Sequence, residues 1–340
     1  MTNAPVTTAP TPTLTSSAAT AAADAAPART PVPGAITHLR HVDLAVPDYE
    51  KQLAFYTGTW GLTQVADDSG IAFLAAEGSP EQYSVRLRRG EKRMDLVAFG
   101  AASAEDVDAL TDRLIADGVQ LVREPGKLDT PGGGYSVRFF DVDGRVVEVS
   151  SDVELRQHRR IEEREAIPVK LSHCVVNSPD PERLRAWYER HLGFRLSDTL
   201  VSPHMGDLMY FLRCNDWHHS FAIARGPHVS LHHASFEMRG VEEYMRGTGR
   251  VKRAGAPLTW GPGRHNAGDN TFSYFHDPHG NTVEYTTELA VVDEDTWHPG
   301  LHDVTDPNTQ DVWGTADPMS ESVAKAQFND PDVLFTPPPV

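Results

Sequence analysis

Three positions in the second half of the chain carry side chains of the types that bind a redox-active metal. His173, the adjacent pair His232 and His233, and Glu284 each lie in a short segment with the composition of a β-strand. Two imidazoles and one carboxylate suit Fe(II) and leave coordination positions open for other molecules. A single strand histidine is more often a core residue than a ligand, so a metal site requires that these side chains share one face.

Alternation along the strands distinguishes the two adjacent histidines. In LHHASFEM, one face carries His232 with apolar residues that suit packing against a helix, and the other carries His233 with polar residues. In NTVEYTT, Glu284 also lies on the more polar face. We therefore favour His233 as the ligand, with His232 as the alternative.

The elements that would position these residues occur twice. LRHVDLAVPDYEKQLAFYTGTWGLT, from Leu39, and LSHCVVNSPDPERLRAWYERHLGFR, from Leu171, each read as a strand, a Pro-Asp helix start, an amphipathic helix and a glycine stop. FFDVDGRVVEVSSD, from Phe139, and YFHDPHGNTVEYTTE, from Tyr274, share a glycine four residues before a glutamate. We predict an α+β protein of two tandem modules, each a curved sheet with helices on its outer face.

Composition sets the predicted boundaries. Residues 1–36 are rich in Ala, Thr and Pro and are predicted to be disordered. Residues 291–340 carry ten acidic side chains against one lysine. The predicted order is a disordered arm (1–36), a first module (37–152), a charged linker (153–168), a second module (169–290) and an acidic, largely solvated tail (291–340). Aromatic residues in the tail predict that it contacts the modules at intervals: Trp297, Trp313, Phe328 and Phe335.

The overall charge excludes several classes of partner. Asp and Glu outnumber Lys and Arg by 48 to 31, a net charge of −17, so neither a nucleic acid nor an anionic membrane is an expected partner. The two cysteines, Cys174 and Cys214, provide no disulfide framework. No apolar run approaches the roughly 18 residues of a membrane span. We expect a soluble cytoplasmic protein.

The order of four segments resembles a known family. LSHCVV, CNDWHHSFAI, LHHASFEM and GPGRHNAGDNTFSYFHDPHGNTVEY follow one another as in the type I extradiol ring-cleaving dioxygenases of the vicinal oxygen chelate superfamily. The resemblance covers residues 37–290 and is most specific over 261–284. It implies two tandem vicinal-oxygen-chelate modules, each built of paired βαβββ units that form a curved, incomplete barrel. It also implies a homo-oligomer that cleaves a catechol ring with O2.

The resemblance assigns the same metal ligands that strand alternation favours. They are His173, His233 and Glu284, around Fe(II) or, as an alternative, Mn(II). In the first module His41 and Glu148 match the first and last ligands, but Asp95 stands at the third position. We expect the first module to be a metal-free partner of the second.

Three further residues acquire roles from the resemblance. His219 would be the acid/base catalyst, suited to moving a proton near neutral pH, while His265 and Tyr274 would donate hydrogen bonds to the catecholate oxygens. Each also has an ordinary interpretation: His219 as one of an exposed pair, His265 as a loop residue and Tyr274 as a core aromatic.

The substrate and two rival functions remain open. The basic residue nearest to the motif, Arg264, lies within GPGRH itself, and we expect a neutral or aromatic ring substituent. A glyoxalase-like isomerase or epimerase would use a similar metal site without O2 and would not need His219, His265 and Tyr274. A non-catalytic protein that binds small aromatic compounds would tolerate loss of the metal ligands.

Overall fold

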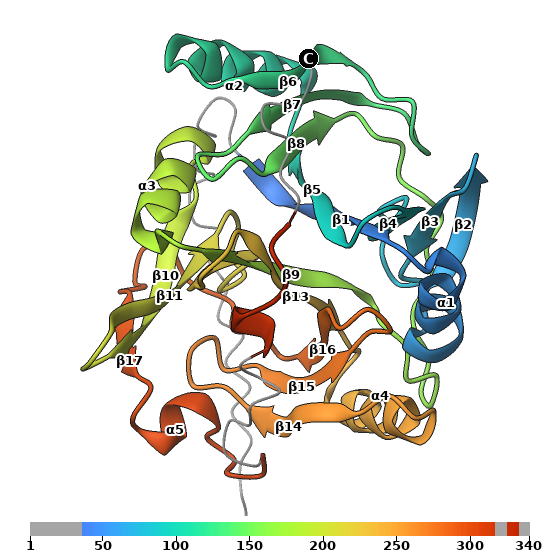
Figure 1. Ribbon diagram of the computed structural model, residues 1–340, viewed down its shortest axis with the longest axis vertical. Coiled ribbons are helices and arrows are strands. Elements are labelled where there is room, and N and C mark those ends of the chain that lie inside the picture. Colours follow the sequence, from blue (N-terminus) through green and yellow to red (C-terminus); the bar gives the residue numbers. More distant parts are fainter. Residues whose placement is uncertain (1–35, 317–324, 333–340) are drawn as a thin grey trace, which may run out of the picture. The chain divides into compact units, whose positions relative to one another are not determined.

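The computed structural model describes residues 36–316 and 325–332. Apart from Ile36, the predicted disordered arm lies outside the described residues, as does Phe335 of the predicted tail. The described strands form two mixed sheets, and neither closes into a barrel (Figure 1). The predicted fold class is confirmed.

The first sheet has eight strands in the order β2-β3-β4-β1-β5-β8-β7-β6. The strands are β1 (Ile36–Val46), β2 (Thr63–Asp68), β3 (Ile71–Ala75), β4 (Val85–Arg89), β5 (Arg93–Ala101), β6 (Leu121–Lys127), β7 (Tyr135–Phe140) and β8 (Val146–Ser151). The helices between them are α1 (Tyr49–Ala54), its π-type continuation η1 (Phe55–Trp60), and α2 (Ala104–Ala116).

The second sheet repeats this order and adds one strand: β14-β15-β16-β13-β9-β12-β11-β10-β17. Its strands are β9 (Lys170–Ser178), β10 (Arg195–Ser202), β11 (Gly206–Arg213), β12 (Phe221–Arg225), β13 (Ser230–Glu237), β14 (Leu258–Arg264), β15 (Thr271–His276), β16 (Thr282–Thr287) and β17 (Gly300–Asp303). The helices that accompany it are α3 (Pro181–Leu192), α4 (Val241–Arg253) and α5 (Pro307–Gln310).

The repeated helix starts and stops have the predicted chemistry. Asp48 and Asp180 cap α1 and α3 by accepting hydrogen bonds from backbone N–H groups of the first helical turn. Gly61 and Gly193 end η1 and α3 with φ of 93° and 71°, a left-handed conformation that glycine adopts without steric cost.

The two modules share one core. Trp60 of η1 is fully buried and stacks on Tyr285 of β16 with ring centroids 4.0 Å apart. It also meets Phe236 of β13 and Phe275 of β15 edge-on, at 5.7 and 6.0 Å. Because this helix of the first module packs on strands of the second, the sheet that carries the candidate ligands depends on both modules.

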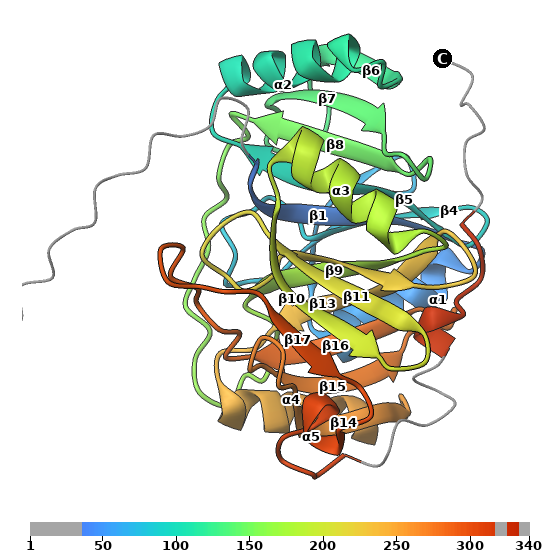
Figure 2. The same ribbon diagram turned by 90° about the vertical axis from the view of Figure 1, so that its left-hand side faces the viewer.

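Parts of the predicted tail pack against the two modules. Strand β17 pairs in parallel with β10. Residues 325–332, whose ribbon is red in Figure 2, form hydrogen bonds to both modules. Asn177 of β9 donates to the Ala326 carbonyl at 2.7 Å, and Lys92 of the first module donates to Asn329, also at 2.7 Å. These hydrogen bonds attach parts of the tail to both modules, whereas the side chain of Phe328 is 62% exposed.

Within the described residues, no helix combines the length and the hydropathy required to cross a bilayer.

Candidate metal centre and active site

Neighbouring strands of the second sheet carry the three predicted ligands. Strand β13 lies between β9 and β16, and its Ser235 pairs with His173 on one side and with Glu284 on the other. His233 lies two residues before Ser235 and therefore on the same face of β13. The sheet thus brings together the side chains that strand alternation placed on one face.

The ligand atoms of these side chains converge. Glu284 Oε2 lies 3.0 Å from Nε2 of His173 and 3.4 Å from Nε2 of His233, and the two Nε2 atoms are 3.4 Å apart. All three residues are buried. Among the described residues, they form a group of three possible ligands with all ligand atoms within 4.8 Å of one another.

The buried carboxylate is incompletely compensated by protein groups. Neither oxygen of Glu284 has a hydrogen-bond partner among the described residues, although ring nitrogens of His173 and His233 lie close to Oε2. Burial raises the pKa of Glu284, but His173 and His233 outweigh burial and hold the pKa well below its usual range. A buried carboxylate without donors is costly unless a cation lies beside it. The arrangement therefore fits a metal ion.

The donor set indicates which ions suit the site. Burial lowers the pKa of His233, which favours the neutral imidazole that binds metals. Two imidazoles and one carboxylate on one side of an ion leave other positions open, the arrangement typical of non-haem Fe(II).

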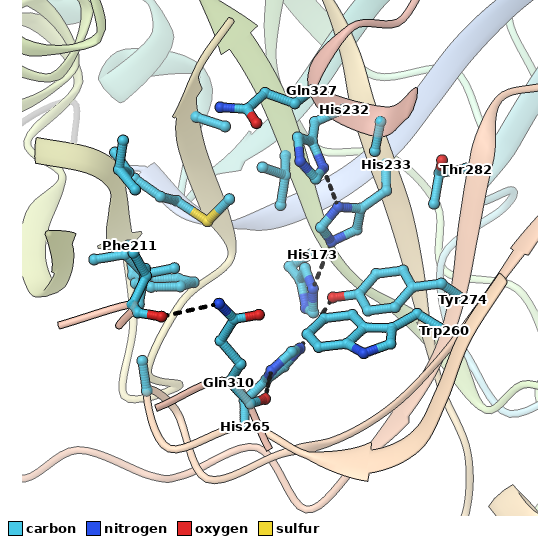
Figure 3. Close-up of a pocket in the computed structure, with 18 of the residues that line it drawn as sticks. His173, Phe211, His232, His233, Trp260, His265, Tyr274, Thr282, Gln310 and Gln327 are labelled. Atoms are coloured by element: carbon cyan, nitrogen blue, oxygen red, sulfur yellow. Dashed lines mark hydrogen bonds between the residues drawn. The ribbon is translucent and has the colours of Figure 1, made fainter. Parts of the chain in front are cut away.

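His232 also belongs to this site, so the prediction that it packs against a helix is wrong. The pairing of β13 with β9 is irregular between Leu231 and His233, which interrupts regular alternation. His232 lines the cavity, and its Nδ1 lies 2.6 Å from Nδ1 of His233 (Figure 3). A hydrogen bond to the second nitrogen of a ligand histidine orients its ring, so His232 supports His233.

His219 is buried beside the metal ligands. It is 2% exposed, and His218 is fully buried, so the interpretation as an exposed pair is excluded. The His219 ring lies 4.3 Å from the His173 ring and 4.9 Å from the Phe211 ring. Burial, followed by the proximity of His173, lowers the pKa of His219 well below its usual value. This shift favours the neutral imidazole, the form that can accept a proton.

His265 and Tyr274 form a hydrogen-bonded pair. Nδ1 of His265 donates to the Gln310 carbonyl at 2.9 Å, so Nε2 of the neutral ring accepts from the Tyr274 hydroxyl at 3.1 Å. Burial lowers the pKa of His265 to about 4. In this state His265 orients Tyr274, and it would need a second proton to donate the hydrogen bond that the resemblance implies.

The glycines of GPGRH allow this pair to form. A Cβ atom at Gly263 would lie 2.4 Å from the Phe272 ring, so only glycine lets β14 approach β15 this closely. Beyond it, His265 stacks on the same Phe272 ring at 4.0 Å.

The candidate site opens into a cavity of about 150 Å³, a size that can hold a single aromatic ring. At one end lie the histidines and Tyr274 (Figure 3). The remaining wall is predominantly apolar and includes Val175, Leu200, Leu208, Met209, Phe211, Ala224, Trp260, Ala267 and Val304.

Part of the cavity wall comes from residues that the sequence did not indicate. Gln310 follows β17, and Gln327 belongs to residues 325–332, yet both line the cavity. Gln327 also donates to the Arg225 carbonyl at 2.6 Å. Trp297 was the available signal in the sequence: its indole donates to the Ser197 carbonyl at 2.8 Å and holds this part of the chain on β10.

The cavity wall carries no charged side chain among its described residues. Arg264 is not part of it, because its guanidinium pairs with Asp269 at 2.8 Å and with Glu288 at 2.7 Å. These two carboxylates compensate the arginine, so it is not available to a substrate carboxylate.

In the first module, the positions equivalent to the three ligands carry a different set of side chains. Ala98 pairs with both His41 and Glu148, just as Ser235 pairs with His173 and Glu284 in the second module. Ala98 is therefore the counterpart of Ser235. The counterpart of His233, two residues earlier on the strand, is Leu96. The assignment of Asp95 to that position is therefore wrong. Leu96 offers no ligand atom, and Glu148 pairs with Arg138 at 2.7 Å.

Comparisons with known proteins agree with the repeated architecture. A model of the Glyoxalase/Bleomycin resistance protein/Dioxygenase superfamily matches residues 38–149 and again residues 170–285. A Mn(II)-bound glyoxalase from Novosphingobium aromaticivorans is 42% identical and has a TM-score of 0.80, with 85% of this chain and 94% of that chain covered.

Two curated relatives are similar over most of their length. Metapyrocatechase 2 from Cupriavidus necator is 28% identical over 279 residues, which is 76% of this chain and 83% of the relative. The 3-methylcatechol 2,3-dioxygenase from Pseudomonas putida is 31% identical over 261 residues, which is 74% of this chain and 89% of the relative.

Replacement of His233 by alanine should abolish metal binding, because it removes one of three ligands. His232→Ala should weaken binding by about 10- to 100-fold, the usual effect of removing a group that orients a ligand. The measurement is metal content per chain after anaerobic loading with Fe(II) or Mn(II) and desalting. His204→Ala, at an exposed position, is the control and should bind normally. Wild-type metal content in His233→Ala would refute this ligand assignment.

Proposed function

The chain belongs to the Glyoxalase/Bleomycin resistance protein/Dioxygenase superfamily, and we propose that it is a metal-dependent extradiol dioxygenase. Its substrate would be a catechol, cleaved beside its hydroxyl groups by O2. The observation that carries the proposal is the buried, neutral His219 beside His173 in a cavity that also contains Tyr274. The similarity to metapyrocatechase 2 and to a 3-methylcatechol 2,3-dioxygenase supports it.

The proposed reaction needs only a catechol and O2. Cleavage of the ring bond next to one hydroxyl produces a carboxylate and an aldehyde or ketone. These groups take up both oxygen atoms, and oxidation of the ring supplies the electrons that reduce O2. No separate reductant is required.

A divalent ion held by His173, His233 and Glu284 would acidify the catechol hydroxyls and place substrate and O2 in adjacent positions. We favour Fe(II), because it matches the two-histidine, one-carboxylate donor set. Mn(II) is the alternative, supported by the Mn(II)-bound relative.

His219 would move the proton. As a neutral imidazole, it can accept a proton from a catechol hydroxyl when the substrate binds. Because burial and the neighbouring histidines lower its pKa, the protonated ring would be a stronger acid than a free imidazolium and could return the proton to an oxygen atom later in the reaction.

Tyr274 would stabilise negative charge on the substrate oxygens. Burial, and then the proximity of Glu284, raises the pKa of Tyr274 well above its usual value, so the hydroxyl remains a hydrogen-bond donor. His265 holds this hydroxyl in the absence of substrate. A catecholate oxygen is a stronger acceptor than a neutral imidazole and could replace it as the partner.

We further propose that the ring substituent is uncharged. A carboxylate on the substrate would lose its hydration next to apolar side chains such as Leu208 and Met209, with no cationic side chain in the described wall to compensate it. Gln310 and Gln327 offer neutral amide groups to a polar, uncharged substituent.

An O2-independent isomerase is the second candidate. It is favoured by the 42% identity to a protein described as a glyoxalase. Such an enzyme would also use a metal and a base but would consume no O2, so oxygen uptake separates the two. The cytoplasmic location and the homo-oligomeric state stay predictions.

Replacement of His219 by glutamine should slow turnover of catechol by about 10²- to 10⁴-fold, the usual contribution of a general acid or base. Glutamine retains hydrogen bonding but cannot accept a proton, so metal content and anaerobic catechol binding should stay near the wild-type values. The measurement is O2 uptake by the metal-loaded enzymes. Equal rates in wild type and variant would remove His219 from the mechanism.

Uncharged catechols should be preferred over acidic ones. We expect kcat/KM for catechol, 3-methylcatechol and 2,3-dihydroxybiphenyl to exceed that for 3,4-dihydroxyphenylacetate by about 10-fold or more, because the acid must desolvate its carboxylate. Leu208→Arg, which adds a cation to the cavity wall, should reduce the difference in kcat/KM between the uncharged catechols and the acid. A wild-type preference for the acid would contradict the assignment of an uncharged substituent, while leaving ring cleavage intact.

A further inference from the structure

A chain of buried hydrogen bonds leads from His219 to Asp198. Nδ1 of His219 lies 3.0 Å from Nδ1 of His218, and Nε2 of His218 lies 2.9 Å from Oδ2 of Asp198 on β10. His218, His219 and Asp198 are 0%, 2% and 4% exposed, so water does not compete for these contacts.

Asp198 is held as a carboxylate by two further donors. The backbone N–H of Gly300, on the paired strand β17, donates to Oδ1 at 2.7 Å. Nε2 of His302 donates to Oδ2 at 3.0 Å. Burial raises the pKa of Asp198, but the hydrogen bonds from His218, His302 and Gly300 outweigh it and lower the pKa to about 2.

These contacts determine where the hydrogens lie. A carboxylate only accepts hydrogen bonds, so Nε2 of His218 must carry a hydrogen. With one hydrogen on each ring, Nδ1 of His218 is then an acceptor and Nδ1 of His219 donates to it. In that arrangement His219 carries no hydrogen on Nε2, the nitrogen left for the cavity that His219 lines.

We propose that Asp198, acting through His218, is a positioning residue that keeps Nε2 of His219 free to accept the substrate proton. Its catalytic consequence rests on the proposed function. In the other tautomer Nε2 of His219 would carry a hydrogen and could not act as a base. The same logic applies when a buried aspartate sets the tautomer of a catalytic histidine.

Asp198→Asn should reverse the tautomers without altering the shape of the site. The Gly300 N–H still requires an acceptor, so the asparagine carbonyl takes the place of Oδ1 and the NH₂ group takes the place of Oδ2. That group donates to Nε2 of His218, whose hydrogen moves to Nδ1. His219 must then accept at Nδ1 and carry its hydrogen on Nε2.

The direct readout is ¹⁵N NMR of histidine-labelled protein loaded with diamagnetic Zn(II), which distinguishes protonated from bare ring nitrogens. We expect a bare His219 Nε2 in wild type and a protonated one in Asp198→Asn. Asp216→Asn is the matched control, because Asp216 is an exposed aspartate in the loop that also carries His218. A bare Nε2 in Asp198→Asn would overturn the proposal.

Kinetics supply an independent readout. We expect Asp198→Asn to lower kcat for catechol by about 10²-fold or more, with metal content unchanged and KM within about threefold of wild type. A merely structural role would instead change metal content and KM. A wild-type kcat in Asp198→Asn would overturn the proposal while leaving the dioxygenase assignment intact.

Replacement of His218 covers the case in which Asp198→Asn does not fold. A glutamine amide can donate to Asp198 and accept from His219, whereas leucine can do neither. We therefore expect His218→Gln to retain kcat within about 10-fold of wild type and His218→Leu to lose more than about 10²-fold. Equal kcat values would contradict the proposal. If the wild type cleaves no catechol, the proposed function fails, and the NMR result alone decides the tautomer assignment.

Discussion

A buried carboxylate without hydrogen-bond donors is the constraint on which the candidate site depends. Glu284 is fully buried, both its oxygens lack hydrogen-bond partners among the described residues, and two ring nitrogens lie within 3.4 Å of Oε2. An anion in this environment is costly, and a cation at the point of convergence provides the compensation. The register of β9, β13 and β16 holds the three ligands together, and the shared core behind these strands keeps that register.

In the first module, a protein side chain compensates the charge of the equivalent buried carboxylate. Its strands have the same order, and Glu148 occupies the place of Glu284 beside His41. There Arg138 pairs with the carboxylate, and Leu96 stands where the second module has His233. One scaffold therefore carries an internal ion pair in one copy and a convergent ligand set, with an adjoining cavity, in the other.

Repeated sequence motifs predicted the two modules, and strand alternation predicted the face shared by the ligands, since both are local patterns. Strand alternation failed at His232, because the irregular pairing of β13 turns that residue toward the cavity. The match of Asp95 to His233 was wrong, because strand pairing, which linear alignment does not report, places Leu96 at that position. Gln310 and Gln327 were missed because no local pattern reports contacts between distant parts of a chain.

The most direct test of the account is oxygen uptake by wild-type protein that has been reconstituted anaerobically with Fe(II) and mixed with catechol or 3-methylcatechol in air. The account predicts that one O2 is consumed for each catechol, with a yellow ring-opened product. Tight metal binding without O2 consumption would contradict the dioxygenase assignment and favour the isomerase. Failure to bind a metal would contradict the ligand set of His173, His233 and Glu284.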